Sequence, residues 1–382
     1  MKKLLTIVAH FPPIKCGVGS YAYKISKYFA KKHEVSVICN SEVEHSFHES
    51  ESFRLYNILE NFTLSDYLKI KRLIGEIIPD IINIHYHGND FMRRVTPAFF
   101  PFTIKRFFPN IPIVSTMHNF QRPHSLPNIS MRSFLEFSDR IIVTNEEELH
   151  KMEERFPGFY NKTSLIPVSA GIEWNGKKHE FSSITLEKIP KGSKIISFFG
   201  FINPEKGVDT LIDAFEKVHE KDSKVHLLMI GDIHTDKSGE LHEYYKSIIN
   251  RIRRKNLDDF ISFTGFCNDF EASNYMLLSD LMVFPFKKGL TSKRSSFLSA
   301  LSHEKPIIST NSKFLPDGIK NNENCIIVEP GDALSLGDAI LKILYNESLK
   351  NTLSKNARSL FLKRYSWDSL YEEMEKILFL KT

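Results

Sequence analysis

Two segments in the second half of this 382-residue chain place cationic side chains where they could hold a phosphate group. The first contains Lys206, which follows an apolar run at 194–200 and a loop with proline. Loops after parallel strands lie at the edge of the sheet where ligands bind, so the ammonium group can reach an anion there as a point charge. A solvated surface lysine is the alternative, and this motif alone does not exclude it.

The second segment joins an apolar run that ends at Pro285 to a helix predicted to begin near 292–295. Serine and threonine are good N-terminal caps, and the first N–H groups of a helix have no intrahelical partner. We therefore predict that the N–H groups of Ser295 and Ser296 bind an anion. The guanidinium group of Arg294 could add a bidentate contact to the same anion. The alternative is that the serine and threonine side chains only cap the helix and that the nearby cations form an ordinary basic surface. Because Lys206 is expected at the equivalent edge of the same sheet, we favour phosphate binding.

A glycine loop near the N-terminus matches a dinucleotide fingerprint only in part. Gly17, Gly19 and Ala22 fit G-x-G-x-x-A, but seven residues separate Gly17 from Ala9, where the first apolar run ends. The fingerprint should follow its strand directly, and no carboxylate after the second strand is placed to bind a ribose hydroxyl. We interpret the loop as one that lets a ligand approach the backbone closely.

Histidines follow two of the apolar runs in the first half of the chain, namely His85 and His87 after one, and His118 and His124 after the other. A zinc site is one interpretation, but no carboxylate or cysteine lies nearby at a familiar ligand spacing. His118 can orient a substrate or donate a hydrogen bond near neutral pH. For His85 and His87 we favour a structural role.

Several motifs are absent from the sequence. It has no Asp-x-Asp, which would seat a divalent cation against a diphosphate, so no metal and no other cofactor is expected. It also has no G-x-x-x-x-G-K-[ST] loop and no G-x-S-x-G elbow. These absences exclude the common nucleoside triphosphatases and the serine hydrolases of that type.

The elements that must position these residues follow a regular alternation, in which short runs rich in valine and isoleucine alternate with helix-length amphipathic segments. We predict strands near 3–9, 34–39, 54–58, 80–84, 112–116, 140–143 and 163–166, and again near 194–200, 224–230, 260–264, 281–285, 306–309 and 325–328. Helices are predicted near 18–32, 64–78, 92–107, 128–137, 146–155, 208–220 and 367–380. Two such series predict an α/β protein of two doubly wound Rossmann-like domains that face each other across a cleft.

Domain boundaries are placed where the composition changes. The segment 176–192 is polar and rich in lysine, and is predicted to be a linker between a first domain at 1–175 and a second at 193–365. The last segment, 366–382, is predicted to be a C-terminal helix. A chain of 382 residues exceeds what one hydrophobic core usually supports, which agrees with two domains.

Composition narrows the class of protein further. Hydrophobic residues at 42% and charged residues at 25% are normal for a globular protein, and no apolar run could span a bilayer. The apolar stretch at the N-terminus is too short for a signal peptide, and the four cysteines show no paired spacing, so we expect a cytoplasmic protein. The net charge of +5 is not gathered into a basic stripe, and no nucleic-acid partner is expected.

In their order along the chain, several of these motifs resemble the retaining family 4 glycosyltransferases of the GT-B fold over nearly the whole length. The matching residues are Pro12-Pro13, Gly17-Val18-Gly19-Ser20-Tyr21, Thr116-Met117-His118, Gly200, Lys206-Gly207-Val208-Asp209-Thr210-Leu211, Met229-Ile230-Gly231-Asp232, Lys305-Pro306-Ile307-Ile308 and Tyr365-Ser366-Trp367. The resemblance also implies that the last helix crosses back onto the first domain.

The sequence departs from the family pattern at three positions. The family usually has an arginine where this chain has Phe201, and two glutamates where it has Thr291 and Ser299. Those glutamates normally contact the donor sugar and the nucleotide ribose. A subset of the family has a Ser/Thr-x-x-Arg-x-Ser loop in their place, and we hypothesise that Arg294 of this loop compensates for the arginine missing at 201.

The resemblance implies transfer of a hexose from a nucleoside diphosphate sugar to a hydroxyl acceptor with retention, in the synthesis of a surface glycan, a glycolipid or a secondary glycoside. Lys206, Arg294 and His118 are the implied catalytic residues. The donor would contact Gly17, Gly19, Lys206, Gly231, Phe266, Thr291, Arg294, Ser295, Ser296 and Ser299. No carboxylate is placed as a covalent nucleophile, so same-face attack is favoured, with the departing phosphate taking the acceptor proton.

The acceptor is expected in the first domain, and a glycan, a lipid-linked molecule or a small molecule would fit. Arg93-Arg94 and the phenylalanines at 99–108 could form a basic and apolar patch that contacts the inner face of a membrane. A buried helix face is the alternative reading of the same phenylalanines.

Other functions stay open. The missing glutamates also suit a non-catalytic sugar-nucleotide-binding partner subunit of another glycosyltransferase. A sugar-nucleotide epimerase or a phosphorylase on the same fold is disfavoured, because the carboxylates of the first and the cofactor-lysine motif of the second are not found. A nicotinamide-dependent dehydrogenase is the most remote alternative.

Overall fold

The computed structural model describes residues 1–14, 16–40, 52–60, 64–87, 100–119, 127–176, 189–232 and 239–379. The chain divides into two units, of which the first comprises Met1–Val168 with Leu370–Thr382 and the second comprises Ser169–Ser369. The second unit begins before the predicted linker, and most of that linker, 177–188, lies outside the described residues.

The first unit is built on a parallel sheet. Its strands are β1 (Lys3–Ile7), β2 (Glu34–Asn40), β3 (Arg54–Leu59), β4 (Ile81–Tyr86), β5 (Ile113–Met117), β6 (Arg140–Val143) and β7 (Thr163–Leu165). Its helices are α1 (Gly17–Phe29), α2 (Leu64–Ile77), α4 (Phe100–Phe107), α5 (Pro127–Phe137), α6 (Glu146–Arg155), α7 (Pro157–Tyr160) and, from the end of the chain, α14 (Trp367–Phe379). Among the described residues the sheet has seven strands in the order β3-β2-β1-β4-β5-β6-β7.

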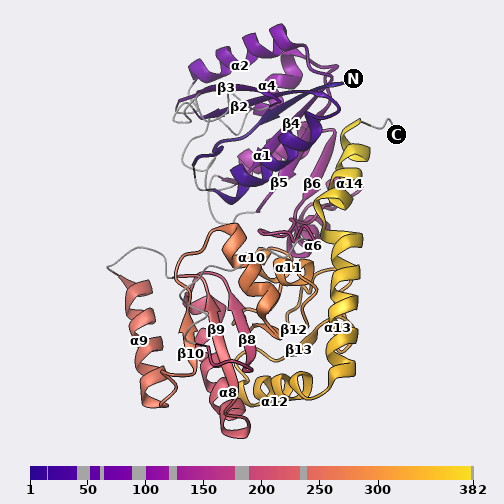
Figure 1. Cartoon of the computed structure of the whole chain (residues 1–382). Coiled ribbons are helices and arrows are strands. Elements are labelled where there is room, and N and C mark those ends of the chain that lie inside the picture. Colours follow the sequence, from indigo (N-terminus) through magenta and orange to yellow (C-terminus); the bar gives the residue numbers. More distant parts are fainter. Residues whose placement is uncertain are drawn as a thin grey trace. The chain divides into compact units, whose positions relative to one another are not determined.

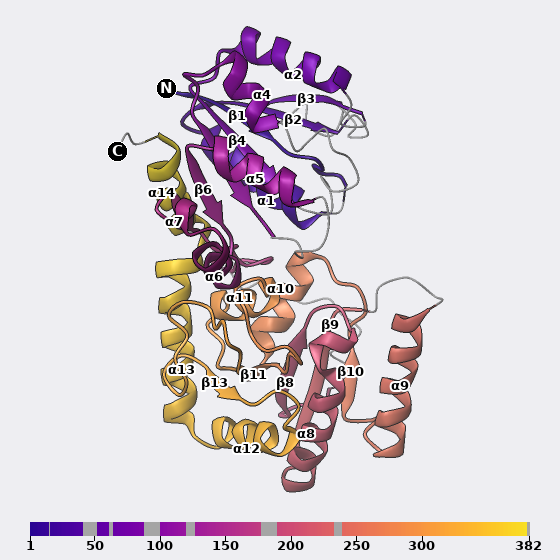
Figure 2. The same ribbon diagram turned by 180° about the vertical axis from the view of Figure 1, so that it is seen from behind.

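Both faces of this sheet are covered, as its continuous apolar strands predict. All six residues of β4 are buried. α1 lies in front of the sheet in Figure 1 and α5 lies in front of it in Figure 2, so helices pack on both faces. The strand order reverses at β1, which pairs with β2 on one side and β4 on the other. Ligands of doubly wound sheets bind beside such a switch point, beyond the carboxyl ends of the strands.

The second unit repeats this plan. Its strands are β8 (Lys194–Phe199), β9 (Val225–Ile230), β10 (Ile261–Phe263), β11 (Leu281–Phe284), β12 (Ile307–Thr310) and β13 (Ile326–Val328). Its helical elements are η4 (Pro204–Lys206), α8 (Val208–Lys221), α9 (Glu240–Arg254), α10 (Asp269–Leu278), α11 (Ser295–Ser302), α12 (Ala333–Leu344), α13 (Glu347–Leu360) and η5 (Phe361–Tyr365). In the described residues the parallel sheet runs β10-β9-β8-β11-β12-β13, and its order reverses between β8 and β11.

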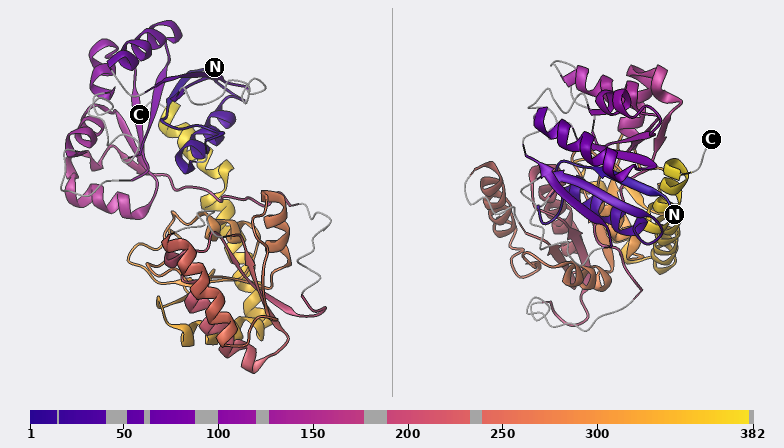
Figure 3. Two further views of the ribbon diagram at one scale, coloured as in Figure 1. Left: turned by 90° about the vertical axis from the view of Figure 1, so that its left-hand side faces the viewer. Right: turned by 90° about the horizontal axis from the view of Figure 1, so that it is seen from above.

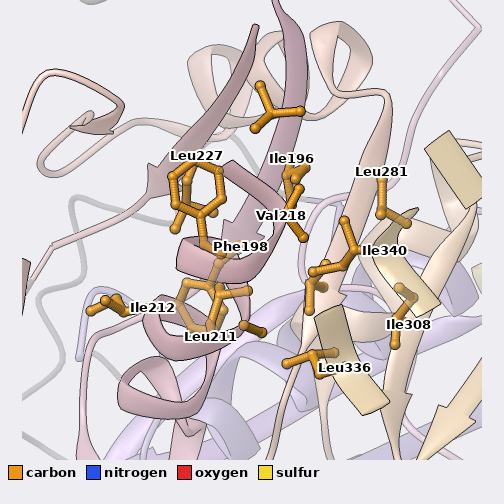
Figure 4. Packing of buried hydrophobic residues seen from close by; sticks show 14 of the residues in the cluster. Ile196, Phe198, Leu211, Ile212, Val218, Leu227, Leu281, Ile308, Leu336 and Ile340 are labelled. Atoms are coloured by element: carbon orange, nitrogen blue, oxygen red, sulfur yellow. The ribbon is translucent and has the colours of Figure 1, made fainter. Parts of the chain in front are cut away.

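The core of the second unit holds β8 against α8. Phe198 of β8 is fully buried in the same cluster as Leu211 and Val218 of α8 and Ile340 of α12 (Figure 4). Burying one such side chain contributes about 2 kcal/mol. The apolar residues of α8 recur at helical spacing, so a single face of the helix meets the sheet. The loop between β8 and α8, which contains Lys206, is therefore held at both ends.

The C-terminal helix α14 packs within the first unit, beside α1 (Figure 3). The ring of Tyr371 stacks on that of Tyr28 with 3.6 Å between centroids, and its hydroxyl donates to the carbonyl oxygen of Lys24 at 3.0 Å. Leu370 and Met374 are buried on the same face of α14. The amphipathic pattern at the end of the chain thus gives the first unit a helix from a distant part of the sequence.

The prediction of an α/β fold with two Rossmann-like domains is confirmed. The predicted helix at 92–107 corresponds to α4 from residue 100 onward, and 92–99 lies outside the described residues. In the described part of the chain, every helix is too short or too polar to cross a membrane.

Candidate functional site

The two phosphate-binding segments predicted from sequence follow β8 and β11, the strands that meet at the switch point of the second sheet. Lys206 ends the short helix η4, and the following Gly207 has a φ of 69°. A Cβ at Gly207 would lie 1.9 Å from the carbonyl oxygen of Pro285. Only glycine therefore permits this backbone to approach the loop after β11 so closely.

Ion pairs and a backbone hydrogen bond also join these two loops. Glu205 pairs with Lys288 at 2.5 Å, and its carbonyl oxygen accepts from the N–H of Lys287 at 3.1 Å. Lys287 in turn pairs with Asp209 of α8 at 2.7 Å. Each exposed pair contributes little to stability alone, but together they keep Lys206 near the loop that carries Arg294.

Lys206 and Arg294 lie over the same aromatic ring. The Lys206 Nζ is 5.1 Å from the ring centroid of Phe286, and the guanidinium carbon of Arg294 is 4.7 Å from it. Burial, and then the charge of Arg294, lowers the pKa of Lys206 to about 8. Burial also lowers the pKa of Arg294. Burial disfavours both charges, and Arg294 further disfavours that of Lys206, so an anion that binds here would stabilise the site.

The N-terminus of α11 differs in detail from the prediction. The helix begins at Ser295, and its N-cap position is occupied by Arg294, which makes no side-chain cap. The N–H of Ser295 already donates to the carbonyl oxygen of Lys293 at 3.2 Å. The capping by serine or threonine considered from sequence is therefore absent at this described helix end.

Two buried polar atoms beside this helix end have no hydrogen-bond partner within the described structure, the Oγ of Ser296 and the Nε of Arg294. Buried polar groups are nearly always hydrogen-bonded in folded proteins. Both atoms can donate, so their position near Lys206 is what an anionic ligand with several oxygens would satisfy.

A pocket of ≈ 360 Å³ opens beside these groups. Five of the residues predicted to contact the donor line it, namely Lys206, Gly231, Phe266, Ser295 and Ser296. The other lining residues are Gly171, Ile172, Phe199, Gly200, Phe201, Asn203, Ile230, Asp232, Cys267, Asp269 and Ala272. Its rim is aromatic, because Phe266 is 72% exposed and Phe201 is 48% exposed.

The other three donor-contact residues predicted in this unit, Thr291, Arg294 and Ser299, do not line the pocket. The hydroxyl of Ser299 is fully buried, donates to the carbonyl oxygen of Ser295 at 2.9 Å and accepts from the N–H of Ile172 at 3.1 Å. Ser302, one turn later, accepts from the N–H of Trp174 at 2.7 Å. Ser299 thus supports the pocket wall at Ile172. Thr291 contributes its carbonyl oxygen to a bond with the N–H of Arg294 at 3.0 Å.

The remaining predicted residues belong to the first unit. His118 follows β5, and its Nε2 lies 3.2 Å from the Nδ1 of His85. A Cβ at Gly19 would lie 2.5 Å from the carbonyl oxygen of His10, so this glycine is needed for packing of α1. At Gly17 no atom lies within 4 Å of such a Cβ, so this glycine faces open space. The predicted positions His124, Arg93, Arg94 and Phe99 lie outside the described residues.

Sequence reasoning missed two features of the pocket. Phe286 unites the two cations, but one phenylalanine at the end of an apolar strand carries no signal of that role. Gly171 and Ile172 line the pocket from a segment that the sequence assigned to the first domain. Among the described residues no group of three or more histidine, cysteine, aspartate or glutamate side chains is arranged to hold a metal ion.

A second cavity, of ≈ 400 Å³, lies in the first unit and is lined by Lys2, Asp80, Asp139, Arg140 and Phe379, among others. It is at the amino ends of the strands. Because doubly wound sheets bind ligands at the opposite edge, we do not include this cavity in the candidate site.

Two family models match this sequence. Glycosyltransferase Family 4 matches residues 16–168, and Glycosyl transferases group 1 matches residues 183–360. The chain is 28% identical to the capsular polysaccharide biosynthesis glycosyltransferase CapM of Staphylococcus aureus, over 62% of this chain and 60% of the relative. It thus spans less than two thirds of the length of CapM. The lipopolysaccharide 1,2-N-acetylglucosaminetransferase of Salmonella typhimurium is 22% identical over 70% of this chain and 67% of its own.

Solved structures with the same fold include a glycosyltransferase from Rickettsia africae, with a TM-score of 0.78 and 17% identity over 100% of this chain and 99% of that one. Anabaena HepE in complex with UDP has a TM-score of 0.71 and 16% identity, over 98% of this chain and 99% of that one. Identities this low bear on the fold alone, and they agree with two Rossmann-like units.

Proposed function

Because this chain belongs to the family 4 glycosyltransferases of the GT-B fold, we propose that it transfers a hexose from a nucleoside diphosphate sugar to a hydroxyl acceptor, with retention of anomeric configuration. The single observation that carries the proposal is the pair of cations Lys206 and Arg294 over Phe286, beside a pocket with unpartnered donors. The capsular polysaccharide and lipopolysaccharide enzymes among its relatives support a role in glycan synthesis.

The diphosphate of the donor binds between Lys206 and the start of α11 in this proposal. Lys206 and Arg294 neutralise its charge, and the hydroxyl of Ser296 donates a hydrogen bond to it. The sugar and nucleoside contact the pocket wall that includes Gly231 and Phe266, where an exposed aromatic ring offers a stacking surface. Anabaena HepE, which shares the fold, was solved with UDP, and this supports a nucleotide in such a fold.

Arg294 takes the place of the arginine that the family has at 201. Two observations support this substitution of roles. Phe201 lines the pocket, so an arginine there would be within it, and Arg294 already shares the Phe286 ring with Lys206. A guanidinium group brought from a different loop would supply the same charge to the diphosphate.

The chemistry requires the bond between the anomeric carbon and the diphosphate oxygen to break while the acceptor oxygen attacks from the same face. The acceptor proton passes to the departing diphosphate oxygen, so no protein carboxylate is needed as base or nucleophile. Lys206 and Arg294 stabilise the charge that develops on the leaving group. They supply the positive charge that a divalent cation would otherwise supply, so we propose that the reaction is independent of metal. His118, in the first unit, donates a hydrogen bond to a substrate hydroxyl.

The first unit binds the acceptor, and we propose that it contacts an anionic membrane surface through α2 and α4. Leu68 is 66% exposed, Phe107 is 50% exposed and Phe102 is 44% exposed, and the Nζ of Lys71 lies 3.6 Å from the Phe107 ring centroid. Phe100, by contrast, is buried in the core. Liposome flotation tests this contact. The wild type should float with anionic vesicles and lose that binding in the variant Leu68→Ser/Phe107→Ser, whereas flotation that is equal with neutral vesicles contradicts the proposal.

A non-catalytic, sugar-nucleotide-binding subunit is the second candidate, because Thr291 and Ser299 occupy the positions of the family's glutamates. A thermal-shift panel of nucleoside diphosphates would identify the bound nucleotide, since a ligand stabilises the folded state according to its affinity. Incubation with the matching radiolabelled sugar nucleotides, with and without EDTA, then separates the candidates. Turnover that survives EDTA supports the metal-independent transferase, whereas nucleotide binding without any turnover or donor hydrolysis supports the second candidate.

A further inference from the structure

Buried polar side chains form a row at the carboxyl ends of β4 and β5 in the first unit. Asn83 and His85 are two residues apart on β4 and therefore share one face of that strand, and both are fully buried. Thr116 of β5 is also fully buried and lies opposite His85 in the parallel register. Buried polar groups are nearly always hydrogen-bonded, and the bonds among these side chains allow donors and acceptors to be assigned.

The hydrogen bonds run in one direction, toward His118. The Oγ1 of Thr116 donates to the Oδ1 of Asn83 at 2.9 Å, which leaves the amide nitrogen of Asn83 facing the Nε2 of His85 at 3.2 Å. An amide nitrogen can only donate, so this Nε2 accepts and the single ring hydrogen of neutral His85 is on Nδ1. That Nδ1 lies 3.2 Å from the Nε2 of His118, and in this tautomer it would be the donor of the bond between them.

The surroundings keep His85 uncharged. Burial lowers the pKa of His85 to about 3, so the ring is neutral at ordinary pH. The ring of Tyr21 packs edge-on, with its centroid 5.9 Å from that of His85 and 5.2 Å from that of His118. Burial also raises the pKa of Tyr21, and its hydroxyl lies 3.7 Å from the Sδ of Met374 in α14. A neutral imidazole with both nitrogens bonded has one stable tautomer.

We propose that Thr116, Asn83 and His85 are positioning residues that hold His118 as the tautomer with its hydrogen on Nδ1. In this tautomer Nδ1 is a donor and Nε2 is occupied as an acceptor. His118 therefore acts on the substrate as a hydrogen-bond donor and not as a general base. This inference rests on the proposed function, in which the acceptor proton goes to the leaving diphosphate.

The opposite order of protons is the specific alternative. If the amide of Asn83 were turned over, its oxygen would accept from the Nε2 of His85. The Nδ1 of His85 would then accept from the Nε2 of His118, and the Nδ1 of His118 would carry a lone pair able to act as a base. The two orders differ at every ring nitrogen, so one measurement on the free protein distinguishes them.

The experiment is nitrogen NMR of the full chain labelled with ¹⁵N-histidine, with the signals of the two rings assigned by loss in His85→Phe and His118→Gln. We expect Nδ1 to be protonated and Nε2 to be unprotonated in both rings. The reverse pattern, or a mixture of tautomers at His118, overturns the inference. This readout needs no substrate, so it stands even if the protein proves to have no transferase activity.

Two substitutions at His85 test whether the tautomer of His118 affects the rate of turnover. His85→Phe keeps a ring but removes the donor, so we expect a mixed tautomer at His118 and a fall in kcat of about tenfold or more, with KM changed less than about threefold. His85→Asn keeps an N–H donor near the position of Nδ1 and should restore both the tautomer and most of kcat. Unchanged turnover in His85→Phe with a mixed tautomer contradicts the functional half of the inference.

A matched control guards against general loss of stability. His226 of β9 is also buried and is bonded to the Oγ of Ser262 at 2.9 Å, in the other unit. His226→Phe should leave the signals of His118 and the kcat unchanged. Should His85→Phe not fold, Thr116→Val removes only the first donor of the row. It should then give a mixed tautomer at His118, and a single retained tautomer in that variant overturns the inference.

Discussion

The two units of this protein share one topology and place different chemistry at the same point of it. Each is a parallel sheet whose strand order reverses beside the first strand of the unit, β1 in the first unit and β8 in the second. The second unit carries two cations, Lys206 and Arg294, in the loops at its switch point. In the first unit the corresponding edge carries two imidazoles, that of His85, which burial keeps uncharged, and that of His118.

This difference suits one unit to bind an anion and the other to orient a hydroxyl group. Cations held close together raise the free energy of the empty site, and an anion that binds there relieves the repulsion and gains affinity. A neutral row of hydrogen bonds adds little long-range attraction, but it fixes which atom donates and which accepts. The second unit is therefore suited to hold a diphosphate, and the first is suited to orient a substrate hydroxyl.

The largest expected effect comes from removing the cation of the second unit that is nearest the pocket. Lys206→Met keeps most of the side-chain length and removes the charge, so we expect turnover to fall about 1,000-fold because the leaving group loses its main stabilisation. Initial rates with the preferred sugar nucleotide measure this. Lys246→Met on the exposed face of α9 is the control and should be silent. If turnover in Lys206→Met fell less than about threefold, the charge of Lys206 would not be what stabilises the leaving group, and the contrast between the two units would fail.

The second cation should matter for affinity. Arg294→Ala is expected to weaken nucleoside diphosphate binding at least about tenfold, because a charge-assisted contact is lost. Isothermal titration measures this directly. The double variant Phe201→Arg/Arg294→Ala should recover most of the affinity, because it places a guanidinium group at the family's usual position, which lines the pocket. Equal affinity of Arg294→Ala and the wild type refutes the compensation between the two positions.

The cations of the second unit should also make the affinity for a nucleoside diphosphate depend on pH. Lys206 has a pKa of about 8 in the empty site, lowered by burial and by Arg294. A bound diphosphate favours the charged lysine, so the complex holds more protons than the free protein and affinity must fall as pH rises through 8. The fall should reach at most about tenfold per pH unit. Titrations between about pH 7 and pH 9 test this, and Lys206→Met should abolish the dependence. A pH-independent affinity in the wild type speaks against Lys206 as a diphosphate ligand.

The fold could be predicted closely from the sequence, because the period of the apolar residues determines each element. For example, 140–143 was predicted as a strand and β6 spans Arg140–Val143. The convergence of Lys206, Ser295 and Ser296 on one pocket was also predictable, since loops after adjacent parallel strands meet at one edge of the sheet.

Other features depend on long-range packing that local patterns do not encode. The bond from the N–H of Ile172 to Ser299 joins residues 127 apart, and nothing near either residue indicates it. The place of Arg294 at the N-cap of α11 was missed because serine and threonine are the better caps and four of them, Thr291, Ser292, Ser295 and Ser296, lie nearby. His85 was interpreted as structural, and only the distance to His118 across two strands gives it a further role.

The smallest expected effect concerns the pocket wall of the second unit. Ser299→Ala leaves the partly buried N–H of Ile172 without its acceptor, and this should destabilise the fold by about 1 kcal/mol. If Ser299 acts only through Ile172, the nucleotide should bind at most about threefold more weakly, because no direct ligand contact is lost. Ser302→Ala is the matched control, since it removes the same kind of bond one turn later, to Trp174 outside the pocket lining. Chemical denaturation and titration of both variants measure the two effects. A tenfold loss of affinity in Ser299→Ala alone would instead make Ser299 a direct ligand of the donor, as the family's glutamate at this position is.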